Sequence, residues 1–286
     1  LEKKKTDIYD YFAFQPLIDH PEGVNSYGKR IDDELLACIC CGFCRLGCPT
    51  FSITHRESKN ARGRNVLAFN YLNGTIEPSK EFVESFYTCA TCQSCTYFCP
   101  AQVKVDEIVE SVREKLYEDG LTPEPVLAVQ DNIHKTGNVY ASAREDRIDI
   151  YPPALKKLAE SAELKPRAET LLFMGCVPSY LDMKMVPSLI QPLDAAGVDY
   201  TTLATDESCC GFPLFLMGDR EGFKTNGEML ISKIKATGAS ELVTPCAGCY
   251  KTFAKLYPEI GDLGIDIYHS VHYLEKLIND GRIKLK

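Results

Sequence analysis

One cysteine spacing occurs twice in this chain and restricts the fold more than any other feature. The run C-x2-C-x2-C-x3-C-P is formed first by Cys38, Cys41, Cys44, Cys48 and Pro49, and again by Cys89, Cys92, Cys95, Cys99 and Pro100. This is the bacterial ligand run for 4Fe-4S clusters, in which the fourth cysteine binds the other cluster. Three closely spaced thiolates can bind three corners of one cubane. The fourth cysteine lies at the start of the helix that follows, away from these three. The repeat therefore predicts two clusters and electron transfer.

Crossed ligation gives each predicted cluster three cysteines from one run and the last cysteine from the other. Cluster 1 is assigned Cys38, Cys41, Cys44 and Cys99, and cluster 2 is assigned Cys89, Cys92, Cys95 and Cys48. Zinc would give no reason for two identical four-cysteine runs closed by proline. Because no position is missing from either run, we expect both clusters to be 4Fe-4S cubanes.

Length and composition indicate two domains and a reducing compartment. The chain has 286 residues, and its 14 cysteines have metal-site spacings rather than those of a small secreted disulfide framework. Its 32 basic and 40 acidic residues give a formal charge of -8, so nucleic acid is not an expected partner. No stretch is apolar enough to span a membrane, and no secretory signal is visible. We expect a cytoplasmic protein that is membrane-associated, if at all, through a partner.

The pattern along the chain predicts an arm over residues 1–30 and a helical domain with the two clusters over residues 31–150. Helices are expected at residues 64–73, 79–87, 105–118 and from Pro123 to about Lys135, several of them next to glycine or proline. A polar, proline-containing stretch follows, and we expect the domain boundary near residues 145–168.

The second domain, residues 165–286, is expected to be an open parallel α/β layer. Short apolar strands alternate with longer helices there, a pattern that predicts a parallel sheet. Strands are predicted at 170–174, 198–203, 241–244 and 265–268, and helices at 182–196, 219–237, 248–257 and 271–279.

Five more cysteines follow the predicted strands of this layer. They are Cys176 after the first strand, Cys209 and Cys210 after the second, and Cys246 and Cys249 after the third. Because ligands bind at the carboxyl ends of parallel strands, three loops that are distant in sequence are expected to meet at one site. Five soft thiolates suit an iron-sulfur cluster, zinc or copper.

The second-domain motif resembles the CCG domain of the B-type subunits of heterodisulfide reductase and their relatives. The resemblance rests on the pattern C-x32-C-C-G-x34-C-x-x-C, which includes Cys209-Cys210-Gly211. The first half, with Asn60-Ala61-Arg62-Gly63-Arg64 after the first run, resembles the helical ferredoxin module of the C-type subunits. The order of the halves is similar to the fused D-type subunits and to the iron-sulfur subunits of glycolate, lactate and glycerol-3-phosphate dehydrogenases.

This resemblance implies a non-cubane 4Fe-4S cluster on the five cysteines, at which a disulfide is cleaved. It makes Cys176, Cys209, Cys210, Cys246 and Cys249 the catalytic site of an oxidoreductase subunit that acts on sulfur groups. A flavoprotein or a membrane cytochrome or quinone-linked subunit would supply the electrons. The disulfide-cleaving subunits carry two CCG repeats and this chain carries one, so a second CCG-bearing subunit is a further expected partner.

Other interpretations stay open at this point. Zinc on four of the five thiolates would leave one cysteine idle. A pure electron relay, wired to a flavin-dependent lactate or glycolate dehydrogenase or to a membrane quinone module, is the alternative to disulfide reduction, and a zinc-stabilised docking scaffold is a weaker one. The remaining cysteine, Cys40, is expected to be a small buried side chain. Arg45, Arg62 and Arg64 are candidates for tuning the clusters, and His269 for supplying a proton.

Overall fold

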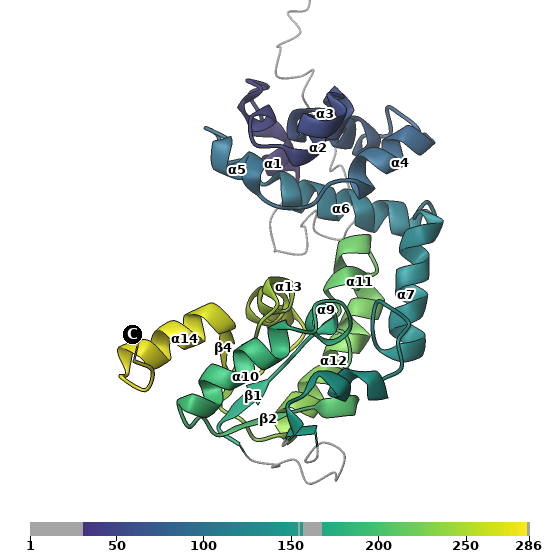
Figure 1. Ribbon diagram of the computed structural model, residues 1–286. Helices are drawn as coiled ribbons and strands as arrows, with labels where there is room; N and C mark the ends of the chain where they lie inside the picture. Colours follow the sequence, from purple (N-terminus) through teal and green to yellow (C-terminus); the bar gives the residue numbers. More distant parts are fainter. Residues whose placement is uncertain (1–30, 154, 157–167, 285–286) are drawn as a thin grey trace, which may run out of the picture. The chain divides into compact units, whose positions relative to one another are not determined.

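The computed structural model describes residues 31–153, 155, 156 and 168–284, so the predicted arm over residues 1–30 lies outside the described part (Figure 1). The chain divides into two compact units, one up to Pro123 and one from Glu124 onward. This division falls before the boundary expected near residues 145–168. The helix α7 (Glu124–Thr136) packs on α11 (Phe212–Met217), which explains why it groups with the second unit.

The first unit is helical in its described part, as the sequence predicts. Its elements are α1 (Ile31–Leu36), η2 (Phe43–Arg45), α2 (Pro49–Thr54), η3 (Glu57–Lys59), α3 (Ala61–Leu72), α4 (Lys80–Tyr87), α5 (Ser94–Phe98) and α6 (Val105–Glu118). The core lies between α3, α4 and α6, where Ile108, Val109 and Val112 of α6 are completely buried. Their spacing puts them on one helix face, which is the face that the sequence pattern indicates.

The second unit contains a four-stranded parallel sheet in the order β2-β1-β3-β4. Its strands are β1 (Thr170–Leu172), β2 (Tyr200–Thr202), β3 (Glu241–Thr244) and β4 (Asp266–His269). The helical elements around it are η4 (Glu145–Ile150), α9 (Cys176–Tyr180), α10 (Met185–Ala195), η5 (Ala204–Asp206), α12 (Arg220–Ala236), α13 (Ala247–Lys251) and α14 (Ser270–Asn279). The expected open parallel α/β layer is confirmed.

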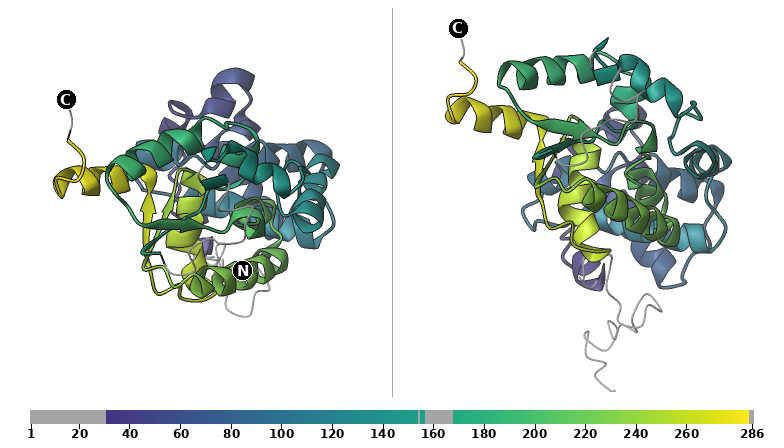
Figure 2. Two further views of the ribbon diagram at one scale, coloured as in Figure 1. Left: turned by 60° about the horizontal axis from the view of Figure 1, so that its bottom comes forward. Right: turned by 90° about the horizontal axis from the view of Figure 1, so that it is seen from below.

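The two sides of the sheet are buried by different helices. Leu172 and Met174 share a hydrophobic cluster with residues of α10 and α14, whereas Phe173 points to the other side and packs edge-on against Phe253 at 4.7 Å between ring centroids. The C-terminal helix α14 follows β4 at the edge of the sheet (Figure 2). Because all four strands run in the same direction, their carboxyl ends lie along one edge, where the five cysteines follow.

One predicted helix differs from the structure. Residues 248–257 are expected to form a single helix, but α13 ends at Lys251 and a π-helical segment, Thr252–Leu256, and a 3₁₀ turn, Tyr257–Glu259, follow. Pro258, which has no backbone N–H to donate to a longer helix, lies near the start of that 3₁₀ turn. Short π segments frequently occur at functional sites, and this one begins three residues after Cys249.

Candidate iron-sulfur sites

The two cysteine loops of the first unit are conformational copies of each other. Cys40 and Thr91, at the same position of each run, have φ values of 56° and 46°. Gly42 and Gln93 also have positive φ, at 86° and 63°. Positive φ is uncommon outside glycine, so two matching pairs of such residues show that both loops follow the same path.

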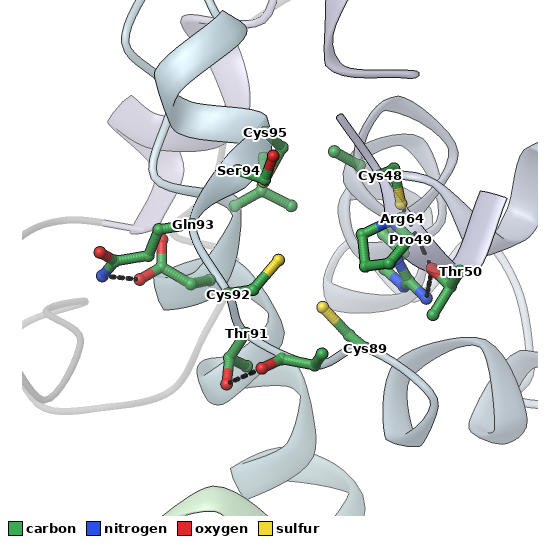
Figure 3. A pocket seen from close by; sticks show the side chains of 14 residues that line it. Cys48, Pro49, Thr50, Arg64, Cys89, Thr91, Cys92, Gln93, Ser94 and Cys95 are labelled. Atoms are coloured by element: carbon green, nitrogen blue, oxygen red, sulfur yellow. Dashed lines mark hydrogen bonds between the residues drawn. The ribbon is translucent and has the colours of Figure 1, made fainter. Parts of the chain in front are cut away.

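Each loop lines its own cavity together with the fourth cysteine of the other run. The first cavity is lined by Cys38, Cys41, Cys44 and Cys99 among others, including Cys95. The second cavity is lined by Cys48, Cys89, Cys92 and Cys95 (Figure 3). This grouping is the one that crossed ligation requires, and the ligand assignment itself stays a prediction.

Buried polar groups surround Cys48 in the second cavity. The Arg64 guanidinium, itself buried, donates to the Thr50 hydroxyl at 3.1 Å and to the Ser85 carbonyl at 2.7 Å. Burial alone would raise the pKa of the Cys48 thiol, but hydrogen bonds from Thr50 and the Phe51 backbone and the charge of Arg64 lower it. In the same cavity burial raises the pKa of Cys95 to about 12. A positive charge at Cys48 favours the thiolate form that a metal ligand requires.

The structure separates the other tuning candidates and corrects the expectation for Cys40. Arg62 lines the first cavity and pairs with Glu57, whereas Arg45 lies over the Phe51 ring at 4.5 Å. Cys40 is exposed rather than buried. It occupies the loop position that Thr91 occupies in the second run, so the loop conformation, and not packing, places this side chain at the surface.

The structure brings the five cysteines of the second unit together at the carboxyl ends of three strands. Cys176 begins α9 after β1, Cys209 and Cys210 follow β2 and η5, and Cys246 and Cys249 flank the start of α13 after β3. Their thiols form a continuous chain of contacts in the order Cys176, Cys209, Cys210, Cys249 and Cys246. All except Cys246 are buried.

The pKa values of neighbouring thiols in this series shift in opposite directions. Hydrogen bonds with their neighbours raise the pKa of Cys209 and of Cys249 well above the ordinary value. Cys210 accepts hydrogen bonds from Cys209 and Cys249, and these bonds lower its pKa. The hydrogen bond with Cys249 likewise lowers the pKa of Cys246 to about 7. Thiols packed this closely resist joint ionisation unless a cation compensates their charge, so the donor set fits a soft metal centre.

Backbone contacts hold the three loops in place. Gly175, with φ of 79° and ψ of 172°, has a conformation that only glycine adopts readily, and a Cβ there would approach Cys249 Sγ to 2.9 Å. The Tyr257 hydroxyl donates to the Cys210 carbonyl at 3.0 Å, and the Asn226 amide donates to the Cys209 carbonyl at 2.9 Å. The Cys209 N–H donates to the Gly137 carbonyl at 2.6 Å. The loops are therefore set by tertiary contacts.

Sequence reasoning missed a buried ion pair beside this site, between Arg147 and Glu207. Burial raises the pKa of Glu207, but Arg147 and the N–H groups of Met174 and Gly175 oppose that change. With three donors on one carboxylate, we assign it the ionised form at neutral pH. The position of Glu207 two residues before the cysteine pair was an available signal, whereas Arg147 lies in the stretch that reads as a polar linker.

His269, the candidate for supplying a proton, lies at the end of β4, and His272 lies in the first turn of α14. His269 caps α14, with its Nδ1 accepting from the Val271 N–H at 3.3 Å. The His269 and His272 rings lie 6.1 and 5.7 Å from the ring of Tyr250, which follows Cys249. Both are thus near the edge that carries the cysteines, but neither forms a hydrogen bond to a cysteine among the bonds of the described residues.

Among the described residues, no group of three or more His, Cys, Asp or Glu side chains is arranged to hold a metal ion. Zinc requires four ligands around one ion. An iron-sulfur cluster differs because each thiolate binds its own iron. Within the same part of the chain, no helix is long and apolar enough to cross a membrane.

Two family models match the chain in the two regions just described. Residues 34–103 match a 4Fe-4S dicluster domain, and residues 170–254 match the cysteine-rich CCG domain. Among curated proteins, the D-type subunit of the dihydromethanophenazine:CoB–CoM heterodisulfide reductase of Methanosarcina acetivorans is 26% identical over 88% of this chain and 65% of its own length. The chain is a distant homologue of this D-type subunit.

Other relatives of this chain carry the names of different oxidoreductases. The EtfAB:quinone oxidoreductase of Syntrophomonas wolfei is 22% identical over 92% of the chain and 42% of its own length. The probable glycolate oxidase iron-sulfur subunit of Bacillus subtilis is 23% identical over 79% of the chain and 60% of its own length. The chain thus spans less than two thirds of each of these relatives. A search of the solved structures found no significant match.

The chain thus contains a region similar to 4Fe-4S dicluster domains followed by a region similar to the cysteine-rich CCG domain, and its relatives include subunits of oxidoreductases. The 4Fe-4S dicluster domain supports two cubanes in the first unit.

Proposed function

We propose that this chain receives single electrons on its two cubanes and passes them to a cluster at the five-cysteine site, where a disulfide is reduced. The observation that carries this proposal is the placement of all five cysteines in the loops at the carboxyl ends of β1, β2 and β3, with four of them buried. A relay that only passes electrons onward needs four thiolates for a cubane, so the fifth favours a centre with chemistry of its own.

The similarity to the D-type subunit of heterodisulfide reductase supports a disulfide as the substrate class. Reduction of one disulfide takes two electrons and two protons and yields two thiols. The electrons come from a reduced flavoprotein or a membrane cytochrome or quinone-linked subunit, one at a time, and the protons come from solvent. The cubane ligands would be Cys38, Cys41, Cys44 and Cys99 for cluster 1, and Cys89, Cys92, Cys95 and Cys48 for cluster 2.

Full-length protein purified without oxygen tests this proposal. Iron and zinc are counted per chain, the protein is reduced with a viologen donor, and the mixed disulfide of coenzyme M and coenzyme B is added. We expect iron beyond that of two cubanes and one disulfide reduced for every two electrons consumed. The variant Cys210→Ser should retain both cubanes and lose disulfide reduction, while Cys40→Ser, which alters the one cysteine outside the three sites, should retain both properties. Iron for two cubanes alone, with zinc on the five cysteines, would contradict it.

A second candidate is a relay without a substrate of its own. The similarity to the glycolate oxidase iron-sulfur subunit and to the EtfAB:quinone oxidoreductase favours it, as does the burial of four of the five cysteines, which limits access of a disulfide. Protein with every cluster present and reduced that leaves the disulfide intact, yet passes electrons to a quinone analogue, would support the relay instead.

A further inference from the structure

A buried ion pair lies at the point where three segments of the second unit meet. Arg147 belongs to η4 and Glu207 follows η5, and these residues are 0% and 1% exposed. The guanidinium Nη1 of Arg147 is hydrogen-bonded to Glu207 Oε1. Removing two charges from water is unfavourable, so a pair this deeply buried is stabilising only where further hydrogen bonds compensate.

Glu207 connects the loop after β2 to the loop after β1. Its Oε2 accepts from the Met174 N–H at 2.9 Å, and its Oε1 accepts from the Gly175 N–H at 2.8 Å. Those two residues lead directly into Cys176, and Glu207 itself leads into Cys209. The carboxylate therefore fixes the distance between two of the three loops that carry the cysteines.

Arg147 completes this connection from the other side. Its Nη1 also donates to the Ser179 hydroxyl at 2.9 Å and to the Gly175 carbonyl at 3.3 Å, next to Cys176. The guanidinium carbon lies 5.0 Å from the centre of the Tyr180 ring. The positive charge is thus held against the first turn of α9, the helix that Cys176 begins.

One edge of the Arg147 guanidinium has no acceptor in the described part of the chain. Its Nε and Nη2 are both buried and form no hydrogen bond there. A buried donor without a partner is unfavourable, so this side chain calls for an acceptor that the described residues do not supply. The free edge is the fork with which arginine binds two-atom or anionic acceptors.

We propose that Arg147 and Glu207 are positioning residues that set the reduction potential of the cluster at the five-cysteine site, Arg147 raising it and Glu207 lowering it. This inference rests on the proposed function, because it takes that site to hold a cluster. Reduction adds a negative charge, so a fixed cation with free donors stabilises the reduced form and a fixed anion destabilises it. Local charge and hydrogen bonds to sulfur are the means by which proteins tune these potentials.

Charge substitutions in the full-length, anaerobically purified protein test this inference. The midpoint potential of the five-cysteine cluster is measured by redox titration with electron paramagnetic resonance detection, and iron is counted per chain. We expect Glu207→Gln to raise the potential and Arg147→Gln to lower it. Arg147→Lys, which keeps the charge and removes the fork, should give a smaller decrease. The double variant, which removes both charges, should lie closer to the wild type than either single variant.

Glu241→Gln is the matched control. Glu241 is a buried acid of the same unit that accepts from the Tyr273 hydroxyl at 2.9 Å and pairs with Lys276, but it begins β3, at the end of the strand opposite to the cysteines. Its substitution should lower the thermal stability and leave the potential unchanged. Opposite shifts from the two partners are the result that a purely structural role would not produce.

Two results are distinguishable failures. A wild-type protein with iron for two cubanes only would contradict the proposed function and this inference together. A wild-type protein that has the third cluster, and whose variants either keep its potential or lose its iron without any shift in the fraction that remains, would overturn the inference alone.

Discussion

The two cysteine regions of this protein are built in different ways. In the first unit each loop carries three of its cysteines within one short run, and the two loops repeat the same backbone conformation, with positive φ at Cys40 and Thr91. In the second unit the five cysteines come from three loops, and contacts far apart in sequence hold them, such as the one between Glu207 and Met174. The first kind of site is specified by local spacing and the second by the folded sheet.

This difference determines how each region should fail. A change in one cysteine loop of the first unit removes cluster ligands. With crossed ligation, loss of the fourth cysteine of one run removes a ligand from the cluster that is bound mainly by the other run. A change near the second site can disable it without altering any cysteine, because the loops depend on close packing. Substitutions in the two regions should therefore separate loss of a ligand from loss of a framework.

The largest effect is expected from pairs of cysteine substitutions in the first unit. With crossed ligation, Cys48→Ser and Cys89→Ser remove ligands of the same cluster, so the double variant should lose no more iron than either single variant. Cys44→Ser combined with Cys48→Ser should lose the iron of both clusters, although the two residues belong to one run. Iron content and the interaction between paramagnetic clusters are the measurements.

Cys40→Ser provides the control in this series. Cys40 is exposed and has positive φ at the position of Thr91, so a serine should be accommodated with all iron retained. If instead Cys44→Ser with Cys48→Ser lost only one cluster, each run would bind its own cluster, and the cavity grouping would not reflect ligation.

The next effect concerns the framework of the second site. Gly175→Ala would place a Cβ 2.9 Å from Cys249 Sγ in a backbone conformation that only glycine adopts readily. Strain of this kind costs about 1–3 kcal/mol, and here relief requires Cys249 to move. We expect loss of metal from the five-cysteine site, with both cubanes retained, as measured by iron content and by thermal unfolding.

Gly197→Ala distinguishes backbone strain from the contact with Cys249. Gly197 also has positive φ, of 66°, but an added Cβ there would meet no atom within 4 Å. This variant should lower the stability of the second unit by about 1 kcal/mol or slightly more and keep its metal. Equal metal loss from both variants would show that the site responds to general instability rather than to the approach of the Cys249 sulfur.

The sequence contains the information for the first site in a short, contiguous form. The spacing of the cysteines and the apolar face of α6 could be predicted because both depend on neighbours a few residues away. The expectation for Cys40 was wrong because it relied on the general tendency of free cysteines to be buried, whereas the repeated loop conformation exposes this one. Comparing it with Thr91, its counterpart in the second run, would have been the better guide.

The second site could be predicted only in outline. Parallel strands imply that the loops after them meet, which brought Cys176, Cys209 and Cys246 together correctly. Arg147 has no periodic or spacing signal, and Glu207 has only its position two residues before the cysteine pair, because the role of both depends on two loops and η4 coming together in the folded unit. The π segment after α13 is equally invisible, since its residues favour an ordinary helix.

The smallest expected effect tests whether stability in the first unit can change without involving its clusters. Asp119 accepts from the Tyr71 hydroxyl at 2.6 Å and pairs with Lys115 at 2.7 Å, and these hydrogen bonds, that of Lys115 first, lower its pKa. A lowered pKa in the folded state gives stability that is present above the unfolded value, about 4, and lost as the pH falls through the folded value. Because the Asp119 side chain is 34% exposed, solvent screening limits this contribution to about 1 kcal/mol or less.

Asp119→Asn should therefore reduce stability slightly at neutral pH and have no effect at a pH below the folded pKa, as followed by chemical denaturation across the acid range. Asp131→Asn, which breaks a fully solvated pair with Lys135 in the second unit, should change nothing measurable. Both variants should retain all iron at neutral pH. A loss of cubane iron in Asp119→Asn would mean that the cysteine loops depend on the far end of α6, and that the first site is less local than its spacing indicates.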